Sequence, residues 1–398
     1  MPPPAFPDPS PAGLFRLLCL LWAVGVSARI TILAVPPINP LLHDDLHLSE
    51  TGIGLLNGLP LGLFALAAIP GSLLVARIGV RRTMLVGLAV TVVASAGRSA
   101  SLDAFMLYAT TALMGFGVAI MQPAIPALVR AWVPTHIGLG TAVSTNGMVI
   151  GATLGSSLTV PFVLPWVEGS WRHDLVLWSA LAGVIAIVFA AFSPRAATAG
   201  SEILPAAQRW WPDWKNPVIW LLGMAFGSTN SLYYGANAFL PGYLVAQGRP
   251  DLVGAALAFL NGSQLLASVT LLVVADRLHR RVWPHLVFGP LAFVGLLAVM
   301  LTAGGWTVVA AGVVGFASAI PFVLLLALPP VLSAPGDVHR MAAGMFTISY
   351  ACAVIIPVIS GAIWDLTGAA WTAFVPLGVC ALAVTGLGAA LNRLRAPA

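Results

Sequence analysis

The chain has 398 residues, of which 59% are hydrophobic and 8% are charged. An average soluble domain carries about 25% charged residues, so this composition excludes an ordinary soluble protein and indicates one that crosses a membrane many times. The formal net charge of +5 does not indicate a nucleic-acid partner, because basic residues in a membrane protein report first on helix orientation.

Apolar segments separated by short polar breaks follow one another along the chain. A helix needs about 20 mostly apolar residues to cross the bilayer, so this length holds roughly a dozen crossings and little else. Residues 1–13, rich in proline and without a basic cluster, are expected to form a flexible tail. The pattern predicts twelve spanning helices, at 14–41, 51–76, 82–100, 103–129, 138–165, 171–192, 217–246, 252–275, 283–303, 306–330, 341–364 and 370–391.

The longest polar stretch, residues 193–216, lies halfway along the chain and separates six predicted helices from six. It contains three tryptophans, which suit a membrane interface. We therefore expect an N-terminal six-helix bundle over residues 14–192, a cytoplasmic linker, and a C-terminal six-helix bundle over residues 217–398.

The basic residues fall almost entirely on one side of the twelve predicted helices. With both termini in the cytoplasm, the inner segments hold fourteen of the eighteen Lys and Arg residues, as the positive-inside rule requires. The inner basic residues are Arg16, Arg77, Arg81, Arg82, Arg130, Arg195, Arg209, Lys215, Arg277, Arg280, Arg281, Arg340, Arg393 and Arg395. The acids assigned to the outer connections are Asp44, Asp45, Glu50, Asp103, Glu168, Asp174, Asp251 and Asp365.

A basic motif occurs once in each half, at residues 76–82 (ARIGVRR) and 276–281 (DRLHRR). Both copies resemble the Gly-x-x-x-Asp-Arg-x-Gly-Arg-Arg loop of the major facilitator superfamily, which joins helices 2 and 3 and recurs between helices 8 and 9. The first copy departs from that loop at Ser72 and Ala76, which removes the acid of the family's salt bridge between the halves, and the second departs at His279. The resemblance implies two pseudo-symmetric six-helix bundles in a monomer, with substrate held between the halves. The candidate gating residues are Arg77, Arg81, Asp276, Arg277 and Arg281.

Further motifs, in the same order along the chain, resemble the cyanate and 2-nitroimidazole transporter family. They are residues 114–117 (MGFG), 122–130 (QPAIPALVR), 170–172 (SWR), 233–235 (YYG) with 239–241 (FLP), and 361–368 (GAIWDLTG). This resemblance implies a secondary transporter of small, flat or anionic solutes in a bacterial inner membrane. No cofactor is expected.

Arg29 lies midway along the first predicted helix, where neither helix end is within reach of its side chain. Burying an unpaired guanidinium at this depth costs at least about 2.5 to 3.5 kcal/mol, so such a residue normally faces a cavity or a partner. Its planar donors can bind a carboxylate, cyanate or nitrate-like ion at two points. The alternative is a structural arginine neutralised by a helix carbonyl or a buried acid, although no Asp or Glu lies near the middle of any predicted span.

A second arginine, Arg98, lies near the outer end of the third predicted helix. It either binds or guides anions, or extends to the interface and pairs with Asp103. Uncharged polar residues within the spans, several on one face of residues 217–246, either contact substrate or join helices through hydrogen bonds. The candidate substrate-binding residues besides Arg29 are Arg98, Tyr233, Tyr234, Asn230, Asn237, Gln122, Asn146, Gln264 and Tyr350.

These observations predict a secondary transporter of a small anion that works by alternating access. No ATP-binding Gly-x-x-x-x-Gly-Lys loop occurs, so gradients must supply the energy. Arg29 from the first half and the helix at 217–246 from the second are expected to close on one anion. The sequence places no buried carboxylate that carries protons, so exchange, facilitated flux and export stand beside proton symport through His43 or Asp44.

Three other functions are alternatives to anion transport. Efflux of neutral or weakly acidic drugs, such as nitroaromatics, is the nearest alternative and would depend more on aromatic residues than on Arg29. A membrane-embedded enzyme is not expected, because the chain has no His-Glu-x-x-His and no Gly-x-Ser-x-Gly motif. Metal transport through Met341 and Met345 is not expected either, because no thiol or mid-membrane histidine joins them.

Overall fold

The computed structural model describes residues 11–48, 50–194, 210–279 and 281–393, and these residues form helices and short connections without a strand. Residues 1–10 of the expected tail and residues 195–209 of the expected linker lie outside the described part. The same holds for four basic residues assigned above to the cytoplasm, namely Arg195, Arg209, Arg280 and Arg395.

Six long helices build the first half of the molecule. They are α1 (Pro11–Leu33), α3 (Glu50–Ile78), α4 (Val80–Ser99), α5 (Ala104–Met121), α7 (Ile137–Leu158) and α9 (Trp171–Phe192). Short helical pieces extend or connect them, namely η1 (Pro36–Ile38), α2 (Asn39–Leu46), α6 (Ala124–Trp132), η2 (Thr159–Val163) and α8 (Leu164–Trp166).

The second half is built in the same way. Its long helices are α10 (Pro217–Ala246), α11 (Val253–Leu278), α12 (Trp283–Leu301), α13 (Gly305–Leu326), α15 (Val338–Thr367) and α16 (Phe374–Arg393). Its short pieces are η5 (Pro250–Leu252), α14 (Pro329–Leu332), η6 (Pro335–Asp337) and η7 (Ala370–Ala373).

Eleven helical segments within the described ranges are long and apolar enough to cross a membrane. The remaining predicted span corresponds to α10, which is 30 residues long but carries two asparagines and two tyrosines along its middle. These polar side chains lower its mean hydropathy. The long helix that is missing from these eleven is therefore the one on which the sequence predicted a polar face.

Four predicted spans are interrupted near prolines, at 14–41, 103–129, 138–165 and 306–330. The first and third illustrate the cause. Within 14–41, α1 ends at Leu33, before Pro36, and the chain continues as η1 and α2. Within 138–165, α7 gives way to a π-helical turn, η2, that contains Pro161. Proline lacks a backbone N–H and its ring collides with the preceding turn, so a continuous α-helix is unfavourable at both places.

Both halves use the same helix pairings. In the first half α1 packs along α7, while α5 packs against α3 and α4, and α4 also contacts α9. In the second half α10 packs along α15, while α13 packs against α11 and α12, and α12 also contacts α16. This correspondence is the structural counterpart of the repeated basic motif.

The α1–α7 pairing depends on glycine. A Cβ at Gly147 would overlap the backbone carbonyl of Trp22, and one at Gly151 would overlap that of Val26. Small residues allow helix backbones to approach closely in a membrane.

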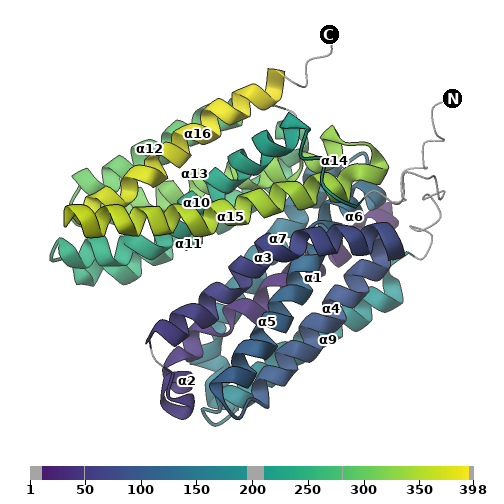
Figure 1. Cartoon of the computed structure of the whole chain (residues 1–398), viewed down its shortest axis with the longest axis horizontal. Coiled ribbons are helices and arrows are strands. Elements are labelled where there is room, and N and C mark those ends of the chain that lie inside the picture. The colour runs from purple at the N-terminus through teal and green to yellow at the C-terminus, as the bar shows by residue number, and fades with distance from the viewer. Residues whose placement is uncertain (1–10, 49, 195–209, 280, 394–398) are drawn as a thin grey trace.

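The two halves converge at one end of the molecule and diverge at the other (Figure 1). We call the end where α6 lies beside α14 and α15 the closed end, and the opposite end, near α2, the splayed end. Between the halves α3 packs on α15, and α7 packs on α11. A Cβ at Gly138 in α7 would lie only 2.6 Å from the carbonyl oxygen of Ala275 in α11, so these helices touch through their backbones.

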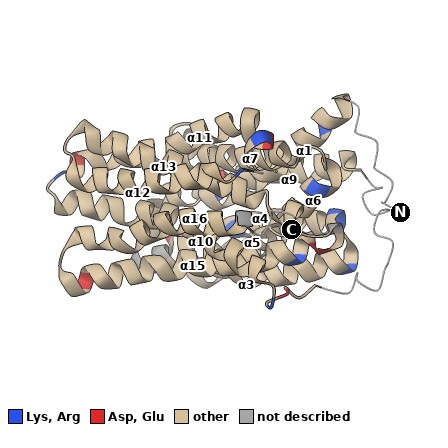
Figure 2. Ribbon diagram, turned by 90° about the horizontal axis from the view of Figure 1, so that it is seen from above, with Lys and Arg blue, Asp and Glu red and all other residues tan. Residues whose placement is uncertain are grey.

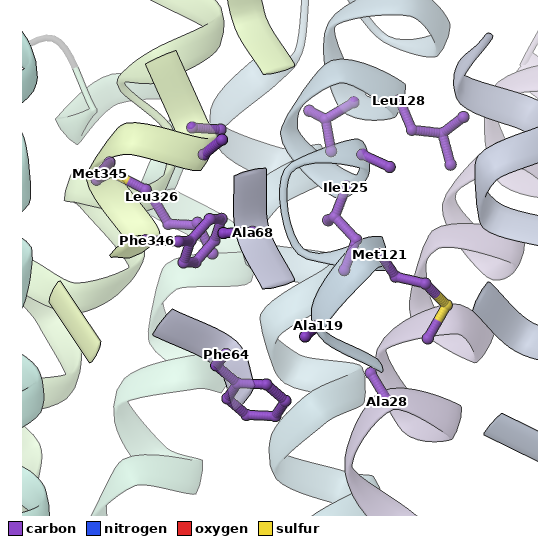
Figure 3. Packing of buried hydrophobic residues seen from close by; sticks show 14 of the residues in the cluster. Ala28, Phe64, Ala68, Ala119, Met121, Ile125, Leu128, Leu326, Met345 and Phe346 are labelled. Carbon is purple, nitrogen blue, oxygen red and sulfur yellow. The ribbon is translucent and has the colours of Figure 1, made fainter. Parts of the chain in front are cut away.

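The distribution of the apolar core follows this shape. One large cluster joins both halves, with Phe64 and Ala68 of α3 packed near Phe346 of α15 and Leu326 of α13 (Figure 3). Two further clusters stay within a single half, one built from α10, α12, α13 and α16 and the other around α2 and η1. The halves therefore share a core toward the closed end and keep separate cores toward the splayed end.

Charge is distributed unevenly between the two ends. Lys and Arg residues gather toward the closed end (Figure 2). The ion pair between Arg172 and Asp45 lies instead in the first-half connections at the splayed end.

Candidate substrate-binding site

A cavity of about 110 Å³ lies between the halves, and Arg29 and Phe64 belong to its lining. It extends past Asn57 toward Pro36 and Leu56, in the direction of the splayed end. Most of its wall comes from the first half, and Tyr234 of α10 is the second-half residue in the lining.

Arg29 is half-buried in α1 and faces this cavity. Its guanidinium lies over the ring of Phe64, 5.6 Å from the ring centre, where the attraction between a cation and an aromatic face is favourable. The ion pairs in the described ranges are Arg172–Asp45 and Arg340–Asp337, so no carboxylate neutralises Arg29.

The partners of Arg29 come from the opposite half. Its side chain interacts electrostatically with Tyr234 of α10 and Tyr350 of α15. The Tyr350 ring also packs edge-on against Phe64, with ring centres 5.0 Å apart. One guanidinium therefore joins α1 and α3 of the first half to α10 and α15 of the second.

The polar face predicted on α10 splits in two. The Tyr233 hydroxyl donates to Oδ1 of Asn261 at 2.9 Å, and Nδ2 of Asn261 donates to Oδ1 of Asn237 at 2.9 Å. Gln264 of α11 also interacts with Tyr233. Tyr233, Asn237 and Gln264 thus join α10 to α11, while Tyr234 lines the cavity.

Two other candidates form contacts within one half, and a third is buried. Asn230 is 3% exposed, and its Nδ2 donates to Oγ of Ser349 at 2.7 Å, which joins α10 to α15. Asn146 in α7 accepts from Nε1 of Trp22 at 3.0 Å. Gln122, which follows α5, is 3% exposed. None of the three lines the cavity.

Arg98 turns into the first half and is fully buried, with 0% exposure. Its Nη2 donates to the carbonyl oxygen of Thr31 and to Oγ of Ser95, both at 2.7 Å, and it lines the same cavity as Arg29. The interpretation that Arg98 reaches the interface and pairs with Asp103 is wrong. Oδ1 of Asp103 accepts instead from the backbone N–H of Met106 at 2.7 Å and caps α5, a favourable position for a carboxylate.

Asp174 is a buried acid that the sequence analysis assigned to an outer connection. It lies in the first turn of α9 with 0% exposure, and its Oδ1 accepts from Nε1 of Trp178 at 3.1 Å. The expectation of no buried carboxylate is therefore wrong. The sequence feature that could have predicted this burial is the position of Asp174 inside the apolar helical segment, one turn before Trp178.

The basic loops lie at the closed end, and one residue in them joins the halves. Oδ1 of Asp276 accepts from the backbone N–H of Leu139 at 2.8 Å, which places a carboxylate at the N-terminus of α7, where the helix dipole favours it. Arg81 remains within the first half, bonded to Oγ of Ser193 and the carbonyl oxygen of Ala190. Within the described part of the chain, no side-chain contact across the halves is seen for Arg77, Arg277 or Arg281.

Ser72 also joins the halves, at the position where the family loop has its first glycine. Its Oγ donates to the carbonyl oxygen of Trp210 at 2.7 Å and lies 2.8 Å from Nδ1 of His339.

Two six-helix bundles that share a core at one end and hold a cavity between them are the architecture of a class of membrane transporters. The chain belongs to the Major Facilitator Superfamily, whose family model matches residues 21–355. The all-helical twelve-span fold expected from the sequence is thereby confirmed. Within the described residues, no three His, Cys, Asp or Glu side chains gather to hold a metal ion.

Three curated relatives are similar to this chain. The uncharacterized transporter YycB of Bacillus subtilis (strain 168) is 25% identical over 376 residues, covering 94% of this chain and 92% of the relative. The cyanate transport protein CynX of Escherichia coli (strain K12) is 24% identical over 359 residues, covering 88% and 91%. The 2-nitroimidazole transporter of the same strain is 24% identical over 232 residues, covering 58% of each chain.

Solved structures share the fold at low sequence identity. The transporter FucP in the outward conformation matches with a TM-score of 0.76 at 13% identity, covering 97% of this chain and 100% of FucP. The human organic anion transporter MFSD10 matches with a TM-score of 0.74 at 15% identity, covering 94% and 99%.

Proposed function

We propose that this protein moves a small anion across the bacterial inner membrane by alternating access, with Arg29 as the main anion-binding residue. The observation that carries the proposal is the environment of Arg29. Its guanidinium faces a cavity between the halves, has no carboxylate partner among the described residues, and interacts with tyrosines of the opposite half.

Anion binding at this position would favour closure of the splayed end. An anion on Arg29 replaces the missing counter-charge, and charge-assisted hydrogen bonds are about twice as strong as neutral ones. The hydroxyls of Tyr234 and Tyr350 approach the same guanidinium from the second half. A ligand that contacts both halves draws them together, and this couples binding to movement.

Orientation follows from the charge distribution. Basic residues gather at the closed end, so the positive-inside rule assigns that end and both termini to the cytoplasm (Figure 2). In this orientation the cavity faces the exterior.

The size of the cavity supports a small solute. Drug-sized ligands occupy pockets of about 300 to 1,000 Å³, whereas the space beside Arg29 is about 110 Å³. The cyanate transporter among the relatives carries such a small ion by its printed name.

The second candidate is efflux of a neutral or weakly acidic nitroaromatic compound. The aromatic rings of Phe64 and Tyr234 in the cavity lining, with Tyr350 packed against Phe64, favour it, as does the printed name of the 2-nitroimidazole transporter. In this case Arg29 would interact with a nitro group or with the ring, and simple anions would not compete.

Thermal stability of the purified protein separates the two candidates. A ligand present at 100 times its dissociation constant stabilises the folded state by about 2.7 kcal/mol, so formate, cyanate, nitrate, nitrite and 2-nitroimidazole are tested one at a time. We expect at least one anion to raise the melting temperature of the wild type but not of Arg29→Gln. The matched control is Arg172→Gln, whose side chain contacts Asp45 outside the cavity. Stabilisation by 2-nitroimidazole alone would support the second candidate.

A further inference from the structure

Asp174 has a hydrogen-bond acceptor without a donor in the interior of the first half. Its side chain has 0% exposure, Trp178 donates to Oδ1 at 3.1 Å, and Oδ2 has no hydrogen-bond partner. Nε1 of Trp178 also donates to Oγ1 of Thr159 at 2.9 Å, so the hydrogen bond that Oδ1 accepts is shared with a second acceptor. An ionised carboxylate in such a site is unfavourable, because a buried charge must be paired and hydrogen-bonded.

Arg98, on the neighbouring helix α4, has buried hydrogen-bond donors without acceptors. Nη2 is committed to Thr31 and Ser95, but Nε and Nη1 are buried without a partner. Oγ1 of Thr111, which is 2% exposed, is also without a partner and lines the same cavity. Three polar atoms at the cavity wall therefore lack partners.

The two buried charges act on each other without touching. Each contributes electrostatically to the other, but neither takes part in the ion pairs of the described ranges. The link between their helices is a hydroxyl chain, in which Oγ of Ser179 on α9 donates at 2.8 Å to the Ser95 oxygen that binds Arg98.

Other charged groups near α9 have partners of their own. α9 packs against α4 and α1, whose charged residues toward the splayed end are Arg98 and Arg29. Arg29 faces Phe64 and the tyrosines across the cavity. Asp45 of α2 is bound by Arg172 and Trp171, and His173 on α9 itself is exposed. Arg98 is therefore the charged group that acts on Asp174.

We propose that Asp174 takes up the proton that is transported together with the anion. When Asp174 is protonated, the anion replaces its carboxylate as the negative charge that balances Arg98. This inference rests on the proposed anion transport. One O–H bond forms at Asp174 with a proton from the bulk solution. The monoanion bound at Arg29 also accepts from Nε and Nη1 of Arg98, which lines the same cavity. The net charge of the site does not change, so a proton and an anion enter together.

The coupling follows from linkage. While Asp174 is ionised it attracts Arg98 and lowers the gain from binding an anion. Protonation leaves Arg98 without a counter-charge in a buried position, which is costly until an anion arrives. Proton and anion therefore raise each other's affinity by the same factor.

Proton uptake on anion binding tests this directly. Purified wild-type protein is titrated calorimetrically with sodium nitrate, sodium cyanate and sodium formate in two buffers of different ionisation enthalpy. We expect uptake of about one proton for each anion bound, and a dissociation constant that rises about tenfold per pH unit where Asp174 ionises. Asp174→Asn should bind the anion without proton uptake and with little pH dependence.

The controls separate the coupling from the anion site. Asp45→Asn, which removes an exposed acid of the same end, should keep the wild-type proton uptake. Arg98→Lys keeps the charge but loses the free guanidinium atoms, so it should weaken binding below neutral pH. Anion binding to the wild type without proton uptake, or unchanged uptake in Asp174→Asn, would overturn the coupling and leave the anion site standing. If none of the three salts binds, the proposed function fails with it.

Discussion

At the scale of single residues, the proposed function depends on one guanidinium. Arg29 lacks an acidic partner in the described part of the chain, and its neighbours are the ring of Phe64 and the hydroxyls of Tyr234 and Tyr350. A hydroxyl can turn from the arginine to an anion with little movement. The site is therefore ready to bind negative charge without breaking an ion pair first.

Removal of one tyrosine hydroxyl tests this arrangement. Tyr350→Phe keeps the ring contacts with Phe64 and Phe346 and loses one donor to the anion. Hydrogen bonds to charged groups contribute about 1.5 to 3 kcal/mol, so the dissociation constant should rise at least about tenfold. Isothermal titration with the stabilising anion measures it. Tyr243→Phe, whose hydroxyl donates to the carbonyl oxygen of Met300 away from the cavity, should bind like the wild type.

The sequence could locate Arg29 but not Asp174 or the correct tyrosine. A charge at mid-span is visible in any hydropathy pattern, whereas the burial of Asp174 depends on which helices cover the first turn of α9. Tyr233 and Tyr234 differ by about 100° around α10, and the rotation of a helix in its bundle is a tertiary property. Sequence reasoning therefore proposed both tyrosines, and the structure brings only Tyr234 to the cavity.

At the scale of helices, close backbone contacts hold α1 against α7 and so position Arg29. A methyl group at Gly147 would collide with the backbone of Trp22, which cannot move without displacing α1. Overpacking of this kind costs about 1 to 3 kcal/mol.

Gly147→Ala should therefore lower the melting temperature of the purified protein. The control is Gly62→Ala in α3, where an added Cβ meets no atom within 4 Å and a helix gains from alanine. Equal melting temperatures for the two variants would show that the α1–α7 contact is less constrained than its geometry indicates.

Helix existence was predictable, and helix interruption was less so. The twelve predicted spans correspond to the long helices because hydrophobic length is a local property of the chain. The prediction missed the breaks at Pro36 and Pro161 and gave one continuous span at each place. Many membrane helices tolerate proline, and the packing decides whether a proline ends the helix.

At the scale of the whole molecule, the proposed alternating access requires the closed end to open. Ser72 meets His339, and Asp276 meets the first turn of α7, so both contacts must separate when this end opens. The shared core around Phe346 would divide along the same surface (Figure 3).

A reversible crosslink across the closed end should stop transport. Ser72→Cys and His339→Cys are combined in a chain whose own cysteines, Cys19, Cys352 and Cys380, are replaced by serine. Oxidation should abolish anion exchange in proteoliposomes, and reduction should restore it, because the substituted side chains are in contact in this state. Undiminished exchange in the oxidised protein would contradict a cycle that opens this end.

The central claim, that a small anion crosses this membrane by binding at Arg29, is tested most directly by isotope exchange. Proteoliposomes that contain wild-type protein or Arg29→Gln are loaded in turn with formate, cyanate and nitrate, and entry of the same labelled anion is followed. We predict exchange of at least one anion by the wild type and none by the folded variant. Exchange by Arg29→Gln at the wild-type rate, or movement of labelled 2-nitroimidazole alone, would contradict the account.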